Sequence, residues 1–337
     1  MITRNDVAAA AGVSPSTVSY VLNDGPRSVS EAIKERVWKA VRELGYHPNA
    51  VARSLRTARV GMVGLMVPDI SNPFFAGLSR GAQDVAKERG YFVVVCNTDG
   101  KLDQEISLMH SLYEHRLEGM IVDPVEVMPK DLTFLQDREV PVVLSGLDRE
   151  QAIADCAGVD DTEAAADAVS HLLELGHIDI ALITGPLKLR RMNNRPDGYR
   201  KALAGRGIPW REELVTNGSY SQVSGYECAR ELAARKVKFT AVFAANDLMA
   251  IGAMAAFQEL GMRVPEDVAL IGFDNIPESN VATPRLSTVD NPHYTQGRVA
   301  AEMLFERING EFTGEPRAVV LPHRLIIRGS TVAGRQG

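Results

Sequence analysis

The sequence has few cysteines, and their arrangement excludes two classes of small, cross-linked domain. Only three occur in 337 residues, Cys96, Cys156 and Cys228. The number is odd, the spacing is wide and no Cys-x-x-Cys pair is present, so neither a disulfide framework nor a zinc ribbon is supported. We expect three reduced, mostly buried thiols in a cytoplasmic protein.

Long apolar runs are missing as well. No stretch approaches the roughly 20 apolar residues that a membrane-spanning helix needs. The run from Val7 to Val13 is short, Asp6 abuts it, and only one basic residue, Arg4, precedes it. This is not the pattern of a secretory signal peptide. We therefore expect no membrane partner.

Recognisable catalytic and metal-binding motifs are absent too. The seven histidines show no H-E-x-x-H or other ligand spacing, and neither a G-x-S-x-G elbow nor a Walker loop occurs. The sequence predicts no catalytic residues, no metal site and no cofactor, and therefore a protein that is not an enzyme.

What the sequence does contain is the composition of a globular protein with an uneven distribution of charge. Hydrophobic residues make up 45% and charged residues 24%, and the length suits a short module joined to one or two larger domains. Residues 1–60 contain nine lysines and arginines against five acidic residues, a net of +4, whereas the remainder has a net of −10. A basic module on an acidic body is typical of a DNA-binding segment attached to a domain that does not bind DNA.

The first 23 residues have the signals of two short helices joined by a tight turn. Thr3 and Asp6 have the spacing of a capping box. Gly12 can end the first helix, because glycine enters the left-handed region without steric cost. Ser14 can cap a second helix with Pro15 at its first position, where a missing N–H is harmless. The pattern predicts a helix-turn-helix.

Apolar residues of both helices and the turn can pack together, which leaves a polar outer face on the second helix. The apolar residues expected to close a small core are Val7, Ala10, Val13, Val18 and Val21. The outer face is expected to carry Pro15, Ser16, Thr17, Ser19, Tyr20 and Asn23. Such a helix fits the major groove of DNA, although a generic helical hairpin has the same local pattern. Apolar residues at helical spacing predict a third helix over residues 30–44.

A resemblance to a known family begins in these motifs and continues through the chain. V-A-x-x-A-G-V-S-x-x-T-V-S-x-V-L-N, followed by L-G-Y-x-P-N-x-x-A-R-S-L, resembles the DNA-binding headpiece and hinge of the lactose-repressor (LacI/GalR) family. Further matches are N-P-F-F at 72–75, G-Y-R-K-A-L at 198–203, A-N-D at 245–247, P-E-D-V-A-L-I-G-F-D at 265–274 and L-P-H-R-L-I-I-R-G-S-T at 321–331.

Beyond residue 59 the sequence predicts an α/β body. Buried-strand runs alternate with amphipathic helices in two consecutive series, which indicates two lobes of parallel sheet flanked by helices. The stretch before Val140 is expected to be loop, and Thr162 is expected to cap the first helix of the second series. The resemblance implies a body similar to periplasmic sugar-binding proteins that crosses three times between its lobes. We expect a headpiece at 1–47, a hinge at 48–59, a first lobe at 60–161 with 292–320, and a second lobe at 162–291 with 321–331.

In a two-lobed α/β body, a ligand binds in the cleft at the carboxyl ends of the strands. This rule selects the loops at 68–75, 185–195, 246–247, 273–275 and 290–291. The candidate effector-binding residues in these loops or beside them are Asp69, Asn72, Phe74, Arg195, Tyr220, Asn246, Asp274 and Asn291. Carboxylates and guanidinium groups can each hold two adjacent hydroxyls, and aromatic rings can stack on a sugar. Of Phe74 and Phe75, one is expected to face the core and the other the cleft.

The resemblance gives some of these residues a role. It implies that Arg195, Asp274 and Asn246 contact the effector, and that Pro15, Ser16 and Tyr20 read base edges. Thr17, Ser19 and Asn23 are expected to contact phosphates. The hinge helix at 49–55, which Asn49 can cap, resembles those that enter the minor groove with a leucine wedge. Here the wedge would be Leu55, flanked by Arg53 and Arg56.

The sequence departs from the family in the first lobe. Many sugar-responsive members have an aspartate where this chain has Gly146, and Asp148 follows two residues later. Either Asp148 takes over that contact or the ligand lacks the hydroxyl concerned. Lys188, Arg190 and Arg191 crowd one cleft loop, which leaves open an acidic or phosphorylated effector as well as three solvated charges.

These expectations combine into one function and two rivals. The sequence predicts a transcriptional regulator, most simply a repressor, that binds a palindromic operator as a homodimer and responds to a small, sugar-like ligand. A dimer is expected because tetrameric members of the family end in a leucine heptad and this sequence has none after Thr331. A sugar receptor without DNA binding, and a sugar-modifying enzyme, are the alternatives.

Overall fold

The computed structural model describes residues 2–22, 28–46, 60–147, 153–187 and 194–332. The chain forms two compact units, residues 1–60 and residues 61–337, and each is described by itself. Among the described residues, no helix is long and apolar enough to cross a membrane.

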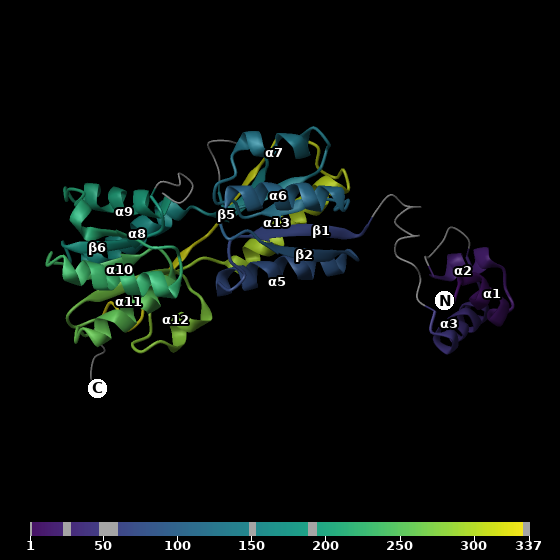
Figure 1. Ribbon diagram of the computed structural model, residues 1–337, viewed down its shortest axis with the longest axis horizontal. Coiled ribbons are helices and arrows are strands. Elements are labelled where there is room, and N and C mark those ends of the chain that lie inside the picture. Colours follow the sequence, from purple (N-terminus) through teal and green to yellow (C-terminus); the bar gives the residue numbers. More distant parts are fainter. Residues whose placement is uncertain (1, 23–27, 47–59, 148–152, 188–193, 333–337) are drawn as a thin grey trace. The chain divides into compact units, whose positions relative to one another are not determined.

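The first unit contains the predicted helix-turn-helix and a third helix (Figure 1). Its helices are α1 (Arg4–Ala11), α2 (Pro15–Leu22) and α3 (Glu31–Leu44). The capping box is present, because the Asp6 carboxylate accepts from the Thr3 N–H and the Thr3 hydroxyl accepts from the Asp6 N–H. Gly12 ends α1 with φ +61°, and the Ser14 hydroxyl accepts from the Thr17 N–H at 3.1 Å. The local signals of this unit are confirmed.

The core of the first unit differs from the prediction at one position. Val7, Val18 and Val37 are fully buried, but Ala10 is exposed and Ala8 and Ala11 are buried in its place. The physical reason is the 100° step between helical residues: positions 7, 8 and 11 share one side of α1, and position 10 lies beyond its edge.

The second unit is built on two six-stranded sheets. In the first sheet the order is β11-β5-β4-β3-β1-β2, with the strands β1 (Met62–Val67), β2 (Phe92–Asn97), β3 (Met120–Val122), β4 (Val142–Ser145), β5 (Asp155–Val159) and β11 (Ala318–Leu321). In the second the order is β12-β10-β9-β8-β6-β7, with the strands β6 (Ile180–Thr184), β7 (Val215–Asn217), β8 (Ala241–Ala244), β9 (Ala269–Asp274), β10 (Ser287–Asp290) and β12 (Arg324–Ile326). All pairs are parallel except β10 with β12, which is antiparallel and departs from the expectation of purely parallel sheets.

Helices cover both faces of each sheet (Figure 1). The first sheet packs against α5 (Pro73–Glu88) and α13 (His293–Ile308) on one face and α6 (Leu102–Glu114) and α7 (Pro129–Gln136) on the other. The second packs against α8 (Asp161–Glu174) and α9 (Asn194–Gly205) on one face and α10 (Gln222–Ala234) and α11 (Asp247–Glu259) on the other. The short η2 (Glu212–Leu214) precedes β7, and α12 (Pro277–Val281) follows β9. We call the two halves the first lobe and the second lobe.

Two details of the predicted elements are wrong. Residues 129–136, expected as loop, form α7, whose Leu132 and Leu135 are buried against the first sheet. The α8 helix is capped by Asp160 rather than Thr162, since the Asp160 carboxylate accepts from the Glu163 N–H at 3.2 Å. Either residue type caps helices, so their order in the sequence could not decide between them.

Three tightly packed helix pairs depend on glycines at their crossings. A Cβ added to Gly297 of α13 would lie 2.0 Å from the backbone carbonyl oxygen of Leu78 on α5. A Cβ added to Gly81 of α5 would lie 2.1 Å from the backbone carbonyl oxygen of Tyr294 on α13. A Cβ added to Gly252 of α11 would lie 1.9 Å from the backbone carbonyl oxygen of Gln222. A Cβ added to Gly198 of α9 would lie 2.3 Å from the backbone carbonyl oxygen of Thr162. These distances are far inside van der Waals contact, so any side chain would force the helices apart.

Gly297→Ala should therefore destabilise the second unit by about 2–3 kcal/mol, because the clash is with backbone that cannot rotate away. Gly205→Ala is the matched control, since Gly205 is exposed and has no atom within 4 Å of its added Cβ; it should change stability by less than about 0.5 kcal/mol. Urea unfolding followed by circular dichroism measures both. Equal stability of the two variants would contradict the close packing of α5 and α13.

Candidate functional site

The first unit exposes one face of α2. Pro15 and Ser16 are exposed and Tyr20 is partly exposed, while Val18 and Val21 face the core. The Thr17 hydroxyl lies 2.8 Å from that of Ser14, so it is held at the start of the helix. This helix end carries small side chains and no acidic residue in its first turn, which suits close approach to a phosphate backbone. Asn23, Asn49, Arg53, Leu55 and Arg56 lie outside the described residues, and their roles stay predictions.

The second unit contains a large cavity between its lobes. Its volume is about 1030 Å³, ample for a mono- or disaccharide, and it lies where the carboxyl ends of the strands meet. Every residue that the sequence selected for effector binding lines it: Asp69, Asn72, Phe74, Arg195, Tyr220, Asn246, Asp274 and Asn291.

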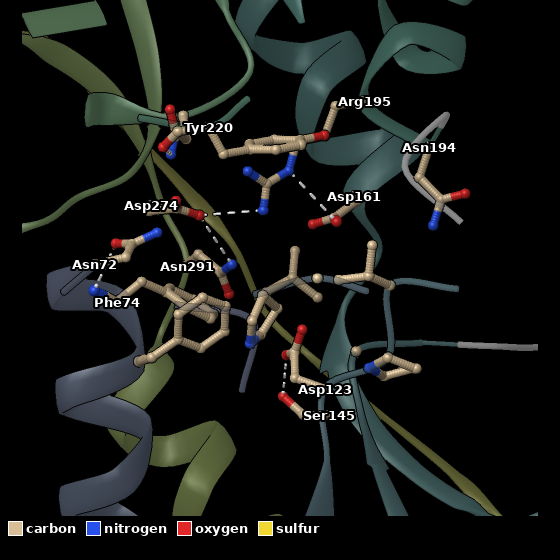
Figure 2. Close-up of a pocket in the computed structure, with 18 of the residues that line it drawn as sticks. Asn72, Phe74, Asp123, Ser145, Asp161, Asn194, Arg195, Tyr220, Asp274 and Asn291 are labelled. Carbon is tan, nitrogen blue, oxygen red and sulfur yellow. Dashed lines mark hydrogen bonds and ion pairs between the residues drawn. The ribbon is translucent and has the colours of Figure 1, made fainter. Parts of the chain in front are cut away.

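Arg195, on α9, lies at the centre of the wall formed by the second lobe (Figure 2). Its guanidinium lies 3.1 Å from Asp274 and 3.4 Å from Asp161, and 3.8 Å above the ring of Phe273. Burial acts to lower the pKa of Arg195, but the two carboxylates outweigh it and raise the pKa above its ordinary value. The group is therefore a permanent cation whose position is set before any ligand arrives.

Asp274 ends β9 in a backbone conformation that side chains rarely adopt, with φ +106°. This turns its carboxylate toward the cavity, where it accepts from Arg195 and, at 3.4 Å, from the Asn291 amide. Burial raises the pKa of Asp274 to about 6, against the lowering effect of Arg195. Backbone strain and a desolvated carboxylate of this kind are concentrated at functional sites, which makes Asp274 a candidate site residue.

Four helices begin at the cavity and contribute their capping residues to its wall. These caps are Asn72, Asp160, Ser221 and Asn246. The carbonyl oxygens of the Asn72 and Asn246 side chains accept from the N–H groups of Phe74 and Met249, so they are used within the fold. The positive ends of the helix dipoles point into the cavity and offset part of its negative charge.

Aromatic groups border the cavity from both lobes. Phe74 and Phe75 both line it and contact each other edge to face at 5.1 Å. Phe74 is also buried in the core of the first lobe, so the two rings do not divide between core and cleft as expected. Tyr220 has φ +60°, and its ring lies so close to Gly185 that a Cβ there would be 2.0 Å from it. Burial raises the pKa of Tyr220 to about 12, so its hydroxyl stays protonated.

Among the lining residues that the sequence interpretation missed, three form one hydrogen-bonded chain. Asp123 follows β3, Ser145 ends β4 and Gln296 lies on α13. The Ser145 hydroxyl donates to Asp123 at 2.7 Å and accepts from the Gln296 amide at 2.8 Å. Asp123 could have been found by the rule that selected the other loops, because it directly follows a predicted strand; nothing in the local sequence points to Gln296.

The cavity is strongly acidic in the part of the chain that the structure describes. Its lining includes the carboxylates of Asp69, Asp99, Asp123, Asp160, Asp161, Glu163, Asp197 and Asp274, and the only guanidinium or ammonium group there is that of Arg195. No three histidine, cysteine or acidic side chains among the described residues are arranged to hold a metal ion. Asp148, Lys188, Arg190 and Arg191, which the sequence raised as further candidates, lie outside the described residues.

The arrangement defines a class of protein: a helix-turn-helix unit joined to a two-lobed body with a polar cleft. In agreement with this, residues 3–49 match the family model "Bacterial regulatory proteins, lacI family", and residues 169–331 match "Periplasmic binding protein-like domain".

Full-length relatives place the chain within that family. It is 36% identical over 332 residues to catabolite control protein A of Priestia megaterium, covering 98% of this chain and 99% of the relative. It is 34% identical over 336 residues to the transcriptional repressor PurR of Yersinia pestis (strain Pestoides F), covering 99% and 98%. The chain belongs to the lacI family of bacterial DNA-binding regulators.

Solved structures agree with this placement. A lac repressor dimer bound to operator and the anti-inducer ONPF is 28% identical and superposes with a TM-score of 0.88 over 98% of this chain and 99% of that one. A complex of the transcriptional regulator CelR with cellobiose is 33% identical, with a TM-score of 0.74 over 98% and 100%.

The pKa of Asp123 gives a test of the cavity's electrostatics without a ligand. Burial raises it to about 7 from the ordinary 3.8, although the Ser145 hydroxyl acts to lower it. Between these values the folded protein keeps a proton that the unfolded chain has lost, so this group makes the free energy of unfolding fall as pH rises from about 4 to about 7.

Asp123→Asn should therefore leave stability unchanged at pH 4 and increase it at pH 8 by about 1–2 kcal/mol, because no desolvated charge has to form. The exposed Asp103→Asn on α6 is the matched control and should have no effect at either pH. Urea unfolding at the two pH values measures the difference. A variant that is equally or less stable than wild type at pH 8 would show that Asp123 is not a desolvated carboxylate.

Proposed function

We propose that the protein is a transcriptional repressor that binds a palindromic operator as a homodimer and is controlled by a small polyhydroxy ligand in the cleft. The observation that carries the proposal is the combination, in one lacI-family chain, of an exposed α2 face with a preformed cleft around Arg195. Because its target is DNA, we place the protein in the cytoplasm.

On the DNA side, Pro15, Ser16 and Tyr20 are proposed to contact base edges in the major groove. Thr17, Ser19 and Asn23 are proposed to contact phosphates and set the register. The hinge is proposed to enter the minor groove, with Leu55 as the wedge between base steps and Arg53 and Arg56 adding charge beside a helix that Asn49 caps.

Exposed apolar side chains support a homodimer. Phe92, on the edge strand β2 of the first sheet, is 75% exposed. On the second lobe, Val281 of α12 is 77% and Val223 of α10 is 67% exposed. Side chains of this kind mark contact surfaces, and an unpaired strand edge is normally protected by a partner. A two-fold dimer would also match the symmetry of a palindromic operator.

The cleft favours a neutral polyhydroxy ligand over an acidic one. A phosphate or carboxylate would enter among eight carboxylates, next to an arginine that two of them already pair. Hydroxyl groups, in contrast, can donate to the carboxylates and accept from Arg195. Related structures carry cellobiose, and ribose in a regulator from Enterococcus faecium, so a sugar is the proposed class.

The DNA-binding part is tested by selecting an operator from a random duplex pool with the full-length protein. Log affinity should fall linearly with log salt concentration, with a slope of several units, because phosphate contacts release counterions. Tyr20→Ala should keep this slope but lose preference at one or two symmetric positions, by about 1–3 kcal/mol per contact. An operator affinity that does not change with salt concentration would exclude the phosphate-contact interpretation. If Tyr20→Ala loses the same affinity for every DNA sequence, Tyr20 only positions the helix.

The effector part is tested in the cleft. A sugar that changes operator affinity should lose this effect in Asp274→Ala and in Arg195→Ala, while operator binding without sugar stays near normal. The conservative Asp274→Asn should also lose most of the effect, because the carboxylate no longer accepts two hydroxyls. Asp267→Asn is the control: its carboxylate pairs with Arg263 outside the cavity. If the sugar still changes operator affinity fully in the three cleft variants, the effector binds elsewhere in the protein.

A further inference from the structure

The first lobe leaves an open space at the end of β4. Gly146 lines the cavity with φ +96°, and no atom lies within 4 Å of the position where its Cβ would be. A side chain at this position would be strained by the backbone, whatever the space around it. The cavity wall therefore has no side chain at position 146 itself.

A carboxylate from the neighbouring strand lies beside this space. In the parallel pair of β3 and β4, Val122 is opposite Leu144, so Asp123 follows alongside Ser145. Ser145 and Gln296 are 4% and 3% exposed, and they hold one oxygen of Asp123, Oδ2, through the hydrogen bonds described above. The single hydroxyl proton of Ser145 goes to Asp123, so its lone pair is what accepts from Gln296.

This chain of hydrogen bonds fixes the orientation of the carboxylate and leaves its second oxygen for the cavity (Figure 2). Oδ1 of Asp123 has no hydrogen-bond partner among the described residues. A second acceptor without a partner is the Oδ1 atom of Asn291, which is buried at the cavity wall. A buried acceptor without a donor is unfavourable. Asn291 Oδ1 can only accept, and Asp123 Oδ1, which faces the cavity, accepts when the carboxylate is ionised, so a ligand that donates would satisfy both atoms.

We propose that Asp123, positioned by Ser145 and Gln296, is the specificity residue through which the first lobe holds hydroxyl groups of the ligand, in place of a side chain at Gly146. This rests on the proposed function of the cleft as a polyhydroxy-effector site. The ligand bridges the lobes: it accepts from Arg195 on the second lobe and donates to Asp123 on the first. A phosphate or carboxylate at this end of the ligand is rejected, because it offers no donor and meets a like charge.

The state of Asp123 also makes binding depend on pH. The charged groups that face it are Asp161 of α8, Arg195 of α9 and Glu105 of α6. Hydroxyl donors favour the ionised carboxylate, so the affinity for the ligand rises as Asp123 loses its proton. A residue with a purely structural role would not change this pH profile.

The experiment measures binding of D-glucose, D-ribose, cellobiose and glucose 6-phosphate to the full-length protein by calorimetry and thermal shift between pH 6 and pH 8. A neutral sugar that binds wild type should bind Asp123→Asn about tenfold or more weakly and with a flatter pH profile. Ser145→Ala should be affected in the same direction but less, and the exposed Asp103→Asn should match wild type. Operator affinity without sugar should be equal in all four proteins, which shows that the variants are folded.

Three results would contradict different parts of this proposal. A neutral sugar that binds wild type and Asp123→Asn equally, with the same pH profile, overturns the role of Asp123 while leaving the cleft as the effector site. Glucose 6-phosphate binding more tightly than glucose overturns the rejection of anions. If none of the sugars binds wild type, the polyhydroxy effector of the proposed function is overturned, and the role of Asp123 falls with it.

Discussion

The buried guanidinium of Arg195 is the constraint on which the cleft depends. It lies between Asp161, the first residue of α8, and Asp274, the last residue of β9. Each of these charges would be costly to bury alone, and the polypeptide passes between the lobes directly before Asp161 and after Asp290 of β10, which is paired with Asp274 of β9. One interaction therefore organises the wall of the cavity near two of the crossings, and it does so before any ligand is present.

Among the described residues that line the cavity, eight carboxylates that can accept hydrogen bonds surround the single guanidinium of Arg195. Parallel strands end at the cavity and helices begin there, so helix N-termini offset carboxylates that would otherwise repel one another. The result is a site suited to donors. The carboxylates of the cavity contribute to the net negative charge of the body, whereas residues 1–60 carry a net positive charge.

Local features were predictable from the sequence, whereas long-range ones were not. The capping box of Thr3 and Asp6, the turn at Gly12 and the ends of the strands follow from residues a few positions apart, and the strand ends in turn selected residues that line the cavity. The exposed position of Ala10 follows from the helical periodicity of α1, whereas the helix α7 depended on tertiary packing. The chain from Gln296 to Ser145 joins residues 151 positions apart, and the glycine contacts between helices have the same origin, so no local pattern could predict them.

We propose that occupation of the cleft and binding of the operator are coupled, and coupling between two sites is reciprocal. The most direct measurement is the affinity for the sugar with the largest thermal shift, determined by calorimetry for the free protein and for the protein saturated with operator. Coupling predicts two different sugar affinities, whose ratio equals the factor by which saturating sugar changes operator affinity. Equal sugar affinities in the two states would contradict the coupling.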